Sequence, residues 1–586
     1  MRWFCVVALV ALVAPREGAC AASASAERGT LTFSELTGAA PLTLPVDMPA
    51  FAPPSTLHAP ANRFEGRLIL QDELGRPGVK VLRDDYGDFG GKDAPARHLP
   101  AFDFAFVQSG NALIPVRRGA IPSASPEWEF ILEPGLVWDE AGDGGFSRAS
   151  LPFTLEERNA NCMHNGVLTF LFKSNGTVSN VVFEIGSETC LYAKFDMWGR
   201  LSARYIPAKV PDAAGISATY EAQLAHRLPV KPIAELASDY LGLDPSHFGS
   251  PAEIDPADMT AYGLVVKGVN YVSACNTRFG AYPFCAELTL PSYSLAKSVF
   301  GGLASMRLSL LYPGVMNEKI AGYVPACAAA GTWSDVTFSD NLNMASGHYI
   351  SSADQIDEGA PDIKPFFLDD THAARIAFAC THYPRKENPG MRWVYHTADA
   401  YILGTALSAF YRGKTRPDAD FYGDVLDGPI WHGLHLDPAI DVIRRSYDRS
   451  AQPLTGWGLT LHRDDVAKLA DFINLDRGAI GGVPLVDRKM LDAALQRDPQ
   501  DPGLPAAYES LRYKNGFWAW NAQTALGCRT PTWIPFMSGF GGIIVALLPN
   551  GMTYYYFSDG GKYAWAKAAK EAAKISPICP EAKNEH

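Results

Sequence analysis

The stretch Pro291-Ser292-Tyr293-Ser294-Leu295-Ala296-Lys297-Ser298 decides how the rest of this sequence is interpreted. Apolar residues follow it at helical spacing, and Pro291 stands where a helix can begin, so the stretch predicts the start of a helix. Ser294 is the only serine in the chain with a lysine three places on. In a helix this spacing puts both side chains on one face, one turn apart. An amine could then take the proton of the hydroxyl, and the positive end of the helix would favour an oxyanion at Ser294.

Length, composition and charge limit the classes of protein that this chain can be. It has 586 residues, of which 47% are hydrophobic and 19% charged, as expected for a folded protein of two or three domains. The formal net charge is −12, and no Lys/Arg run is present. Because nucleic acid and anionic membranes both need a basic surface, neither is expected as the main partner.

The first residues have the pattern of a secretory signal. A positively charged start precedes an apolar stretch from Trp3 to Ala14, which is too short to span a bilayer, and a small-x-small cleavage site follows at 24–26. We therefore expect residues 1–26 to be a signal peptide and the protein to be exported, to a periplasm or outside the cell. A lipid anchor at Cys20 is disfavoured, because Glu17 stands where such a signal has an aliphatic residue. No later segment is expected to cross a membrane.

The cysteines beyond the signal are even in number, which in an exported protein suggests disulfides. They are Cys162, Cys190, Cys275, Cys285, Cys327, Cys380, Cys528 and Cys579. We expect neighbours in the sequence to pair. No Cys-x-x-Cys occurs, so a structural zinc site is not expected. His432 and His435 have loose metal-ligand spacing, but the sequence offers them no evident carboxylate or cysteine partner, so loop packing is preferred and no metal site is predicted.

The chain divides into regions of different pattern. Residues 27–210 carry short β-rich runs separated by Gly, Pro, Asn and Asp clusters, which predicts a β-rich N-terminal domain, a sandwich being one form for it. Residues 211–260 look like a connector with a helix from Ile233 to Leu241. Residues 261–578 mix helices and strands and begin with a predicted hairpin, 261–267 and 269–272.

Two later motifs complete a set with Ser294 and Lys297. Tyr395-His396-Thr397 precedes an apolar helix, and Met537-Ser538-Gly539-Phe540 precedes two strands. In this order and spacing the motifs resemble those of the penicillin-recognising serine hydrolases. The likeness is greatest to the branch of class C β-lactamases, DD-peptidases, related esterases and nylon-oligomer hydrolases. It covers residues 261–577, and the N-terminal region resembles no family that we can name.

The resemblance implies a fold and a catalytic group. The fold would be α+β: an antiparallel sheet flanked by helices, with a mostly helical insert between the first and last motifs and with its first and last strands adjacent. Ser294 would be the nucleophile, and Lys297 and Tyr395 would form the base system. Lys297 must be neutral to act, which burial favours, and its ammonium form would make the Tyr395 phenol more acidic.

The same resemblance assigns roles to the residues around this group. The backbone N–H groups of Ser294 and Phe540 would bind the oxyanion, while Ser538 and Gly539 would lie on the strand beside the substrate. His396 and Thr397 would lie behind the reacting groups. No metal or organic cofactor is required by this chemistry.

Two departures from the family pattern bear on the substrate. Thr397 replaces an amide, and Met537 replaces the cation that helps to hold a β-lactam or peptide carboxylate. Because a desolvated carboxylate needs a paired charge, the absence of that cation favours a neutral ester or amide. The first hypothesis is therefore a secreted esterase or amidase acting on a small-molecule or peptide-like substrate. Two alternatives are a DD-peptidase or β-lactamase acting on cell-wall-like substrates, and a catalytically silent binding protein.

Overall fold

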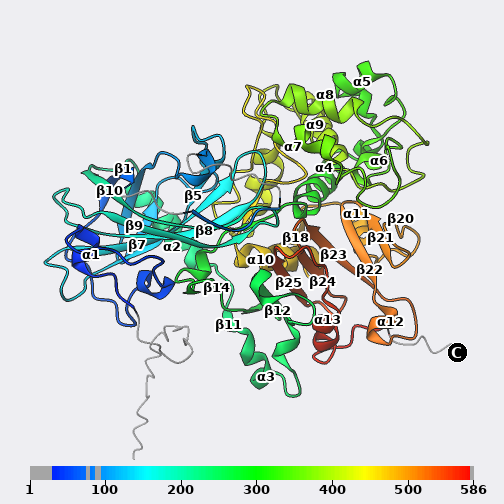
Figure 1. The fold of residues 1–586 in the computed structure, drawn as a ribbon. Helices are drawn as coiled ribbons and strands as arrows, with labels where there is room; N and C mark the ends of the chain where they lie inside the picture. The colour runs from blue at the N-terminus through cyan, green and yellow to red at the C-terminus, as the bar shows by residue number, and fades with distance from the viewer. Residues whose placement is uncertain (1–28, 74–78, 86–93, 581–586) are drawn as a thin grey trace, which may run out of the picture.

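The N-terminal part of the chain is a closed antiparallel β-barrel, seen at the left of Figure 1. The computed structural model describes residues 29–73, 79–85 and 94–580, so the predicted signal peptide and Cys20 lie outside the described residues. The strands are β1 (Glu65–Glu73), β2 (Val79–Arg83), β3 (Asp103–Ser109), β4 (Ala112–Pro115), β5 (Trp128–Leu132), β6 (Gly135–Trp138), β7 (Ser147–Glu157), β8 (Met163–Phe172), β9 (Val181–Thr189) and β10 (Lys194–Pro207).

Closure of the barrel depends on the first strand. The pairing path β1-β3-β4-β6-β7-β8-β9-β10 returns to β1, which pairs with both β3 and β10. Phenylalanines fill the interior, among them Phe64, Phe106, Phe153 and Phe170. The β-rich character is as expected, but the suggested sandwich is wrong. Alternating strands suit either architecture, and the partner of β1 that distinguishes them is more than 100 residues away in the sequence.

A second sheet of nine strands organises the C-terminal half. Its order is β11 (Val230–Pro232), β13 (Val269–Val272), β12 (Met259–Val266), β25 (Thr553–Ser558), β24 (Ile543–Leu547), β23 (Trp533–Gly539), β22 (Phe517–Asn521), β21 (Leu511–Lys514) and β20 (Leu504–Pro505). Apart from the parallel pair β11–β13, all neighbours are antiparallel. The predicted hairpin is confirmed as β12–β13, and the expected adjacency of first and last strands is confirmed as β12–β25.

Each face of the second sheet is covered by different helices. Along β24, Ile543 and Val545 join the large core that contains α4 and α10, while Ile544 and Ala546 join the core beneath α13. This alternation follows from the two-residue period of a strand. The helices are α1 (Phe33–Thr37), α2 (Ala213–Ala225), α3 (Leu236–Asp239), α4 (Leu303–Leu311), α5 (Pro325–Ala330), α6 (Phe338–Leu342), α7 (Lys364–Leu368), α8 (His372–Thr381), α9 (Thr397–Lys414), α10 (Arg463–Asn474), α11 (Arg488–Ala494), α12 (Gln523–Leu526) and α13 (Ala566–Ala572). Helices α5 to α9 gather at the upper right of Figure 1.

The connector is more helical than expected. The predicted helix from Ile233 to Leu241 is a 3₁₀ turn, Ile233–Glu235, followed by the short α3. Ahead of it lies α2, which the sequence did not indicate. Gln223 is the only buried residue of α2, so this helix lacks the apolar stripe by which sequence periodicity identifies helices.

Four disulfides join the cysteines. The pairs are Cys162–Cys190, Cys275–Cys285, Cys327–Cys380 and Cys528–Cys579. The expectation that neighbours in the sequence pair is confirmed. Among the described residues, no helix is both long enough and apolar enough to cross a membrane.

Candidate active site

Ser294 lies in a turn at the start of a buried helix. The turn follows the short strand β16 (Leu290–Pro291), and helical residues begin at Leu295. The segment Lys297–Gly302 is a π-helix that continues into α4, a local geometry often found at functional sites. The predicted one-face arrangement of serine and lysine is present, because Lys297 Nζ lies 2.8 Å from Ser294 Oγ.

Tyr395 joins this pair from the segment that leads into α9. Its hydroxyl donates to Ser294 Oγ at 2.7 Å. Its ring stacks on Trp518 at 6.0 Å between centroids, and Lys297 Nζ lies 4.9 Å from the ring centroid. The structure therefore brings Ser294, Lys297 and Tyr395 together although about 100 residues separate the tyrosine from the other two.

The amine of Lys297 has three polar neighbours. Besides Ser294 Oγ, these are Thr397 Oγ1 at 2.9 Å and the Gly456 carbonyl oxygen at 3.4 Å. Burial disfavours the ammonium form and lowers the pKa of Lys297 to about 8, and the Glu358 carboxylate opposes that shift. The lysine is thus closer to neutrality than a lysine in water.

The electrostatics of Tyr395 differ from the sequence-based expectation. Burial, and then the negative charge of Glu358, raise the pKa of Tyr395 well above its ordinary value. The predicted increase in phenol acidity is therefore wrong, because desolvation of the phenolate outweighs the nearby amine. The phenol keeps its proton and acts as a hydrogen-bond donor to Ser294.

Glu358 is a neighbour of the site that sequence reasoning missed. Its Oε2 accepts a hydrogen bond from the Thr397 backbone N–H at 2.9 Å, and its Oε1 accepts from the Thr397 hydroxyl. The residue lies in the loop between α6 and α7, which has no motif of its own. Thr397 thus connects the lysine to a carboxylate, where the family pattern has an amide.

The end of β23 lies against the Ser294 turn. A side chain at Gly539 would come within 2.9 Å of the Ser292 carbonyl oxygen, so only glycine permits this approach. The Phe540 ring, 41% exposed, lies 5.7 Å from the Tyr293 ring. Within the part of the chain that the structure describes, the backbone N–H groups of Ser294 and Phe540 are not among the hydrogen-bond donors, which leaves them available to a ligand.

Ser538 and Met537, the two residues before Gly539 on β23, differ in exposure. Ser538 is half-buried and pairs with Ile544. Met537 is buried in the main core, so an apolar side chain occupies the place of the family's cation.

His396 faces away from the serine. Its Nε2 lies 3.0 Å from Asp357 Oδ2, and its ring stacks on Tyr383 at 4.0 Å between centroids. Asp357 also accepts hydrogen bonds from the backbone N–H groups of Ile350 and Ser351 at 2.8 Å. His396 is therefore a buried support for the loop that carries Glu358.

Apart from His164 beside the Cys162–Cys190 disulfide, two clusters of side chains that could bind a metal lie elsewhere among the described residues. His432 Nε2 lies 3.2 Å from Asp427 and 3.6 Å from Asp441, two carboxylate partners that were not evident in the sequence. A buried cluster contains Glu133, Glu287, Asp437 and His462. There the Arg118 guanidinium donates to Glu133 and Asp437 and already supplies a cation to these carboxylates. Among the described residues neither cluster contacts Ser294 or Lys297.

Comparison with known proteins finds similar folds only among solved structures. The chain is similar to a penicillin-binding-protein homologue from Caulobacter crescentus (17% identity, 60% of this chain and 96% of that one, TM-score 0.39). It is also similar to EstCE1, a hydrolase with promiscuous acyltransferase activity (13%, 61% and 98%, 0.40), and to the D-alanine carboxypeptidase AmpC from Burkholderia cenocepacia (13%, 62% and 99%, 0.37). No protein-family profile and no curated protein matches the chain. At these identities and TM-scores, the chemistry must be inferred from the chain's own side chains.

Proposed function

We propose that this protein is a serine hydrolase that cleaves an ester or amide bond through an acyl-enzyme on Ser294. The observation that carries the proposal is the contact of Ser294 Oγ with both Lys297 Nζ at 2.8 Å and the Tyr395 hydroxyl at 2.7 Å. A serine hydroxyl becomes a good nucleophile only when a base removes its proton. Ser294 Oγ therefore contacts one candidate base, the Lys297 amine, and one hydrogen-bond donor, the Tyr395 hydroxyl.

The hydrogen bonds of the Lys297 amine support this residue as the base. The Thr397 hydroxyl donates its single hydrogen bond to Glu358, so Thr397 Oγ1 must accept a hydrogen bond from Lys297. The Gly456 carbonyl can only accept as well. A neutral amine has two protons and one lone pair, so these two acceptors leave its lone pair directed at the Ser294 hydroxyl. Lys297 is therefore positioned to accept that proton.

The proposed acylation step balances as follows. Ser294 Oγ forms a bond to the substrate carbonyl carbon, and its proton passes to Lys297. The backbone N–H groups of Ser294 and Phe540 stabilise the oxyanion, a contribution of about 3–4 kcal/mol in comparable sites. The bond to the leaving alcohol or amine then breaks, and the proton passes from Lys297 to the leaving group. Water then attacks the acyl carbon as its proton passes to Lys297, the bond from that carbon to Ser294 Oγ breaks, and Lys297 returns the proton to Ser294 as the acid product leaves.

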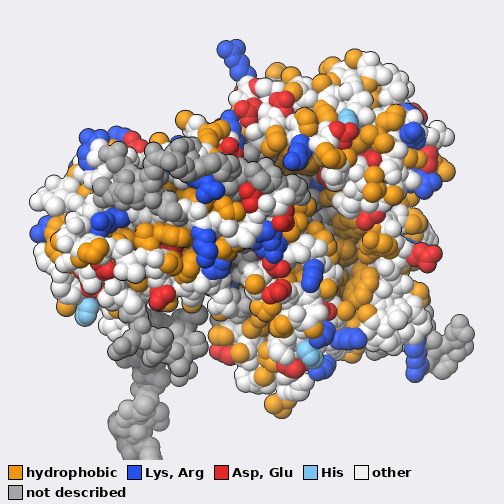
Figure 2. Space-filling view, viewed as in Figure 1, with side chains coloured by type: hydrophobic (Ala, Val, Ile, Leu, Met, Phe, Trp, Pro, Cys, Tyr) orange, Lys and Arg blue, Asp and Glu red, His pale blue; other side chains and the backbone are white. Residues whose placement is uncertain are grey.

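The surroundings of the site favour an uncharged substrate. Met537 is buried where the family pattern has a cation, and the Glu358 carboxylate disfavours an anion near Lys297. Figure 2 shows hydrophobic side chains gathered in the hollow between the helical part at the upper right and the sheet below it. Elsewhere on the face in view, basic and acidic side chains are interspersed, which gives no support to nucleic acid as a partner. Four disulfides support the proposal that the protein works outside the cytoplasm.

Labelling with a fluorophosphonate probe tests the proposed function. Intact-mass and peptide mass spectrometry of the purified protein should find one adduct, on Ser294. Ser294→Ala should remove it, and Lys297→Ala should slow its formation by about 10²-fold or more, because the base is lost.

A serine on the same helix provides the matched control. Ser298 is buried like Lys297, but its hydroxyl donates to the Gly516 carbonyl oxygen and not to the site. Ser298→Ala should keep the label. A folded protein without any adduct would favour a silent binding protein, while acylation of Ser294 by a labelled penicillin would favour the cell-wall alternative.

A further inference from the structure

We propose that Asn161, a residue of the N-terminal barrel, positions the Ser294 nucleophile, so that the barrel is a structural part of the active site. This inference rests on the proposed function and extends it to a part of the chain outside the serine hydrolase motifs. Asn161 lies in the turn between β7 and β8, here called the β7–β8 turn (residues 158–162), and is fully buried.

The side-chain oxygen of Asn161 binds the backbone beside the nucleophile. Asn161 Oδ1 accepts from the Tyr293 N–H at 2.7 Å, from the Ser292 hydroxyl at 3.1 Å and from the Gly458 N–H at 3.3 Å. Tyr293 directly precedes Ser294, and Gly458 lies two residues after Gly456, whose carbonyl faces Lys297. One amide oxygen therefore holds both the segment that carries the nucleophile and the segment that lies beside the base.

The Ser294 turn is a segment that needs such support. Tyr293 has φ 38°, in the left-handed region that residues other than glycine rarely adopt. Backbone strain of this kind persists only where surrounding contacts enforce it. The hydrogen bond from the Tyr293 N–H to Asn161 is a direct contact of this kind, and it acts one residue from Oγ.

Asn161 is itself held by a hydrogen bond to a carboxylate that pairs with an arginine. Its Nδ2 donates to Glu156 Oε1 at 2.8 Å, which assigns the amide orientation and leaves Oδ1 facing Tyr293. Glu156 in turn pairs with Arg444 at 2.8 Å. The next residue, Cys162, is bonded to Cys190. The β7–β8 turn that carries Asn161 is thus held on one side by Glu156 and on the other by the Cys162–Cys190 disulfide.

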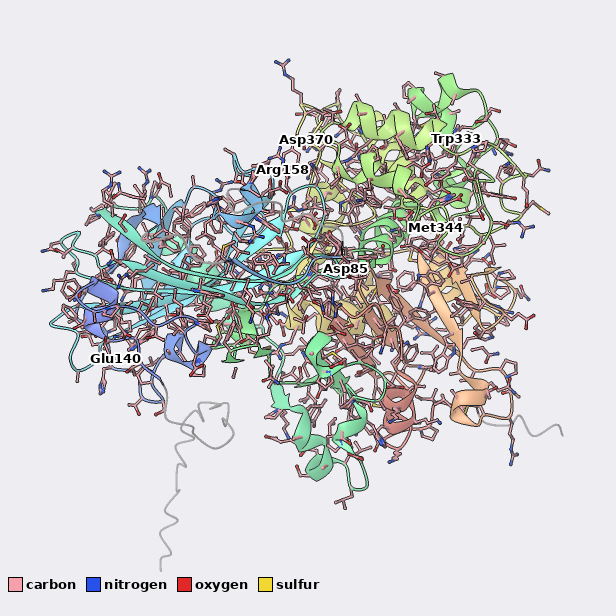
Figure 3. The ribbon with its side chains drawn as sticks, in the orientation of Figure 1. Asp85, Glu140, Arg158, Trp333, Met344 and Asp370 are labelled. Carbon is pink, nitrogen blue, oxygen red and sulfur yellow. A yellow bond between two sulfur atoms is a disulfide. The ribbon has the colours of Figure 1, made fainter. Side chains whose placement is uncertain are left out.

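The rest of the β7–β8 turn is anchored in the C-terminal half. The Asn159 carbonyl accepts from Trp457 Nε1 at 2.9 Å, and Asn159 Oδ1 accepts from Arg375 at 3.0 Å. Figure 3 shows Arg158 next to Asp370, with which it pairs at 3.3 Å. These contacts join the barrel to α8, to the loop before it and to the segment next to Gly456.

Asn165, on the strand β8 that follows the turn, is a matched control. It is also buried, and it makes four hydrogen bonds: Oδ1 accepts from the Thr154 hydroxyl and from the hydroxyl and N–H of Thr289, and Nδ2 donates to the Thr289 carbonyl. Its distances are 3.0–3.3 Å, and its partners Thr154 and Thr289 lie outside the Ser294 turn. Asn165→Ala therefore removes a similar set of hydrogen bonds between the barrel and the C-terminal half without touching Tyr293.

The experiment compares Asn161→Ala, Asn161→Asp and Asn165→Ala in the full-length protein. The second-order rate of fluorophosphonate labelling is measured and divided by the folded fraction. Hydrogen–deuterium exchange of the peptide that covers 291–298 is followed in parallel. We expect Asn161→Ala to label about 10- to 100-fold more slowly than Asn165→Ala, with faster exchange in that peptide. Asn161→Asp keeps an acceptor oxygen and should recover part of the rate.

The outcomes separate this inference from the proposed function. Equal labelling of the folded Asn161→Ala and Asn165→Ala proteins would overturn the inference while leaving the serine hydrolase intact. If no variant and no wild-type protein labels, the proposed function fails, and the exchange comparison alone decides whether Asn161 fixes the Ser294 turn. If Asn161→Ala does not fold, Asn161→Leu, which has a similar size but no acceptor oxygen, takes its place, and equal labelling of the folded Asn161→Leu and Asn165→Ala proteins would overturn the inference.

Discussion

At the scale of single residues, Glu358 sets the protonation of the base without touching the nucleophile. Burial lowers the pKa of Lys297 to about 8, and the Glu358 charge keeps it from falling further. Because neutral lysine is the active form, acylation should increase with pH through about pH 8. Glu358→Gln keeps an acceptor for Thr397 but removes the charge, so the pKa of Lys297 should fall and the acidic limb of kcat/KM should move to lower pH. A pH–rate profile measures this directly.

A neighbouring acid gives the control for that shift. Asp354 lies four residues earlier in the same loop, and its hydrogen bond goes to Gln355. Asp354→Asn should leave the acidic limb in place. The proposal that Lys297 is the base would be contradicted if Glu358→Gln moved the acidic limb of the pH–rate profile to higher pH or left it in place.

Single residues also show what the sequence can and cannot predict. Ser294 and Lys297 are three places apart, so helical geometry alone predicts their contact, and the structure has it at 2.8 Å. Glu358 and Asn161 reach the site from an irregular loop and from another sheet. No local period places them there, because their positions depend on how distant segments pack. The acidity of Tyr395 was misjudged for the same reason, since burial cannot be read from its motif.

At the scale of elements, the first disulfide supports the β7–β8 turn that carries Asn161. Cys162–Cys190 closes a separation of 28 residues and Cys528–Cys579 one of 51, so removing either pair should cost about 2–4 kcal/mol of unfolding free energy. Only the first pair adjoins the β7–β8 turn. Replacing Cys162 and Cys190 by alanine should therefore also slow fluorophosphonate labelling of the folded protein, by several-fold, whereas the second double replacement should not.

Denaturant titration and labelling together check this prediction. The stability loss is read from the unfolding transition, and the labelling rate is measured well below it. Equal labelling rates in the two double variants would mean that the disulfide stabilises the barrel without fixing the turn.

Helices and strands could be predicted where their signal lies within one short stretch of sequence. The hairpin β12–β13 follows from the spacing of strand-like runs and the turn between them, and it is present. The closure of the barrel is a pairing between β1 and β10, and α2 has almost no buried side chain. Neither leaves a periodic signal, because each depends on a partner far along the chain.

At the scale of the whole molecule, four cations whose side chains are buried or half-buried join the barrel to the C-terminal half. Arg118 and Lys194 extend from the barrel to Asp437 and to Asp258 with Asp559. Arg278 and Arg444 extend in the opposite direction, to Glu188 with Asp196 and to Glu129 with Glu156. Separating the two halves would remove these partners, although Arg118 would keep Glu133 of the barrel. A buried ion pair broken on one side typically costs about 3–5 kcal/mol, so the halves should not unfold independently.

Calorimetry should accordingly show one thermal transition, with the labelling activity lost in the same temperature range. Arg444→Met leaves Glu129 and Glu156 buried without their cation and should lower that single transition. Arg67→Met is the control, because Arg67 pairs with Asp103 at the exposed surface of the barrel, where water screens the pair and its contribution to stability is small. Two separate transitions in the wild type, or an Arg444→Met protein in which only the barrel melts early, would show that the halves fold independently. The barrel would then support the nucleophile only through contacts that can break without unfolding the rest.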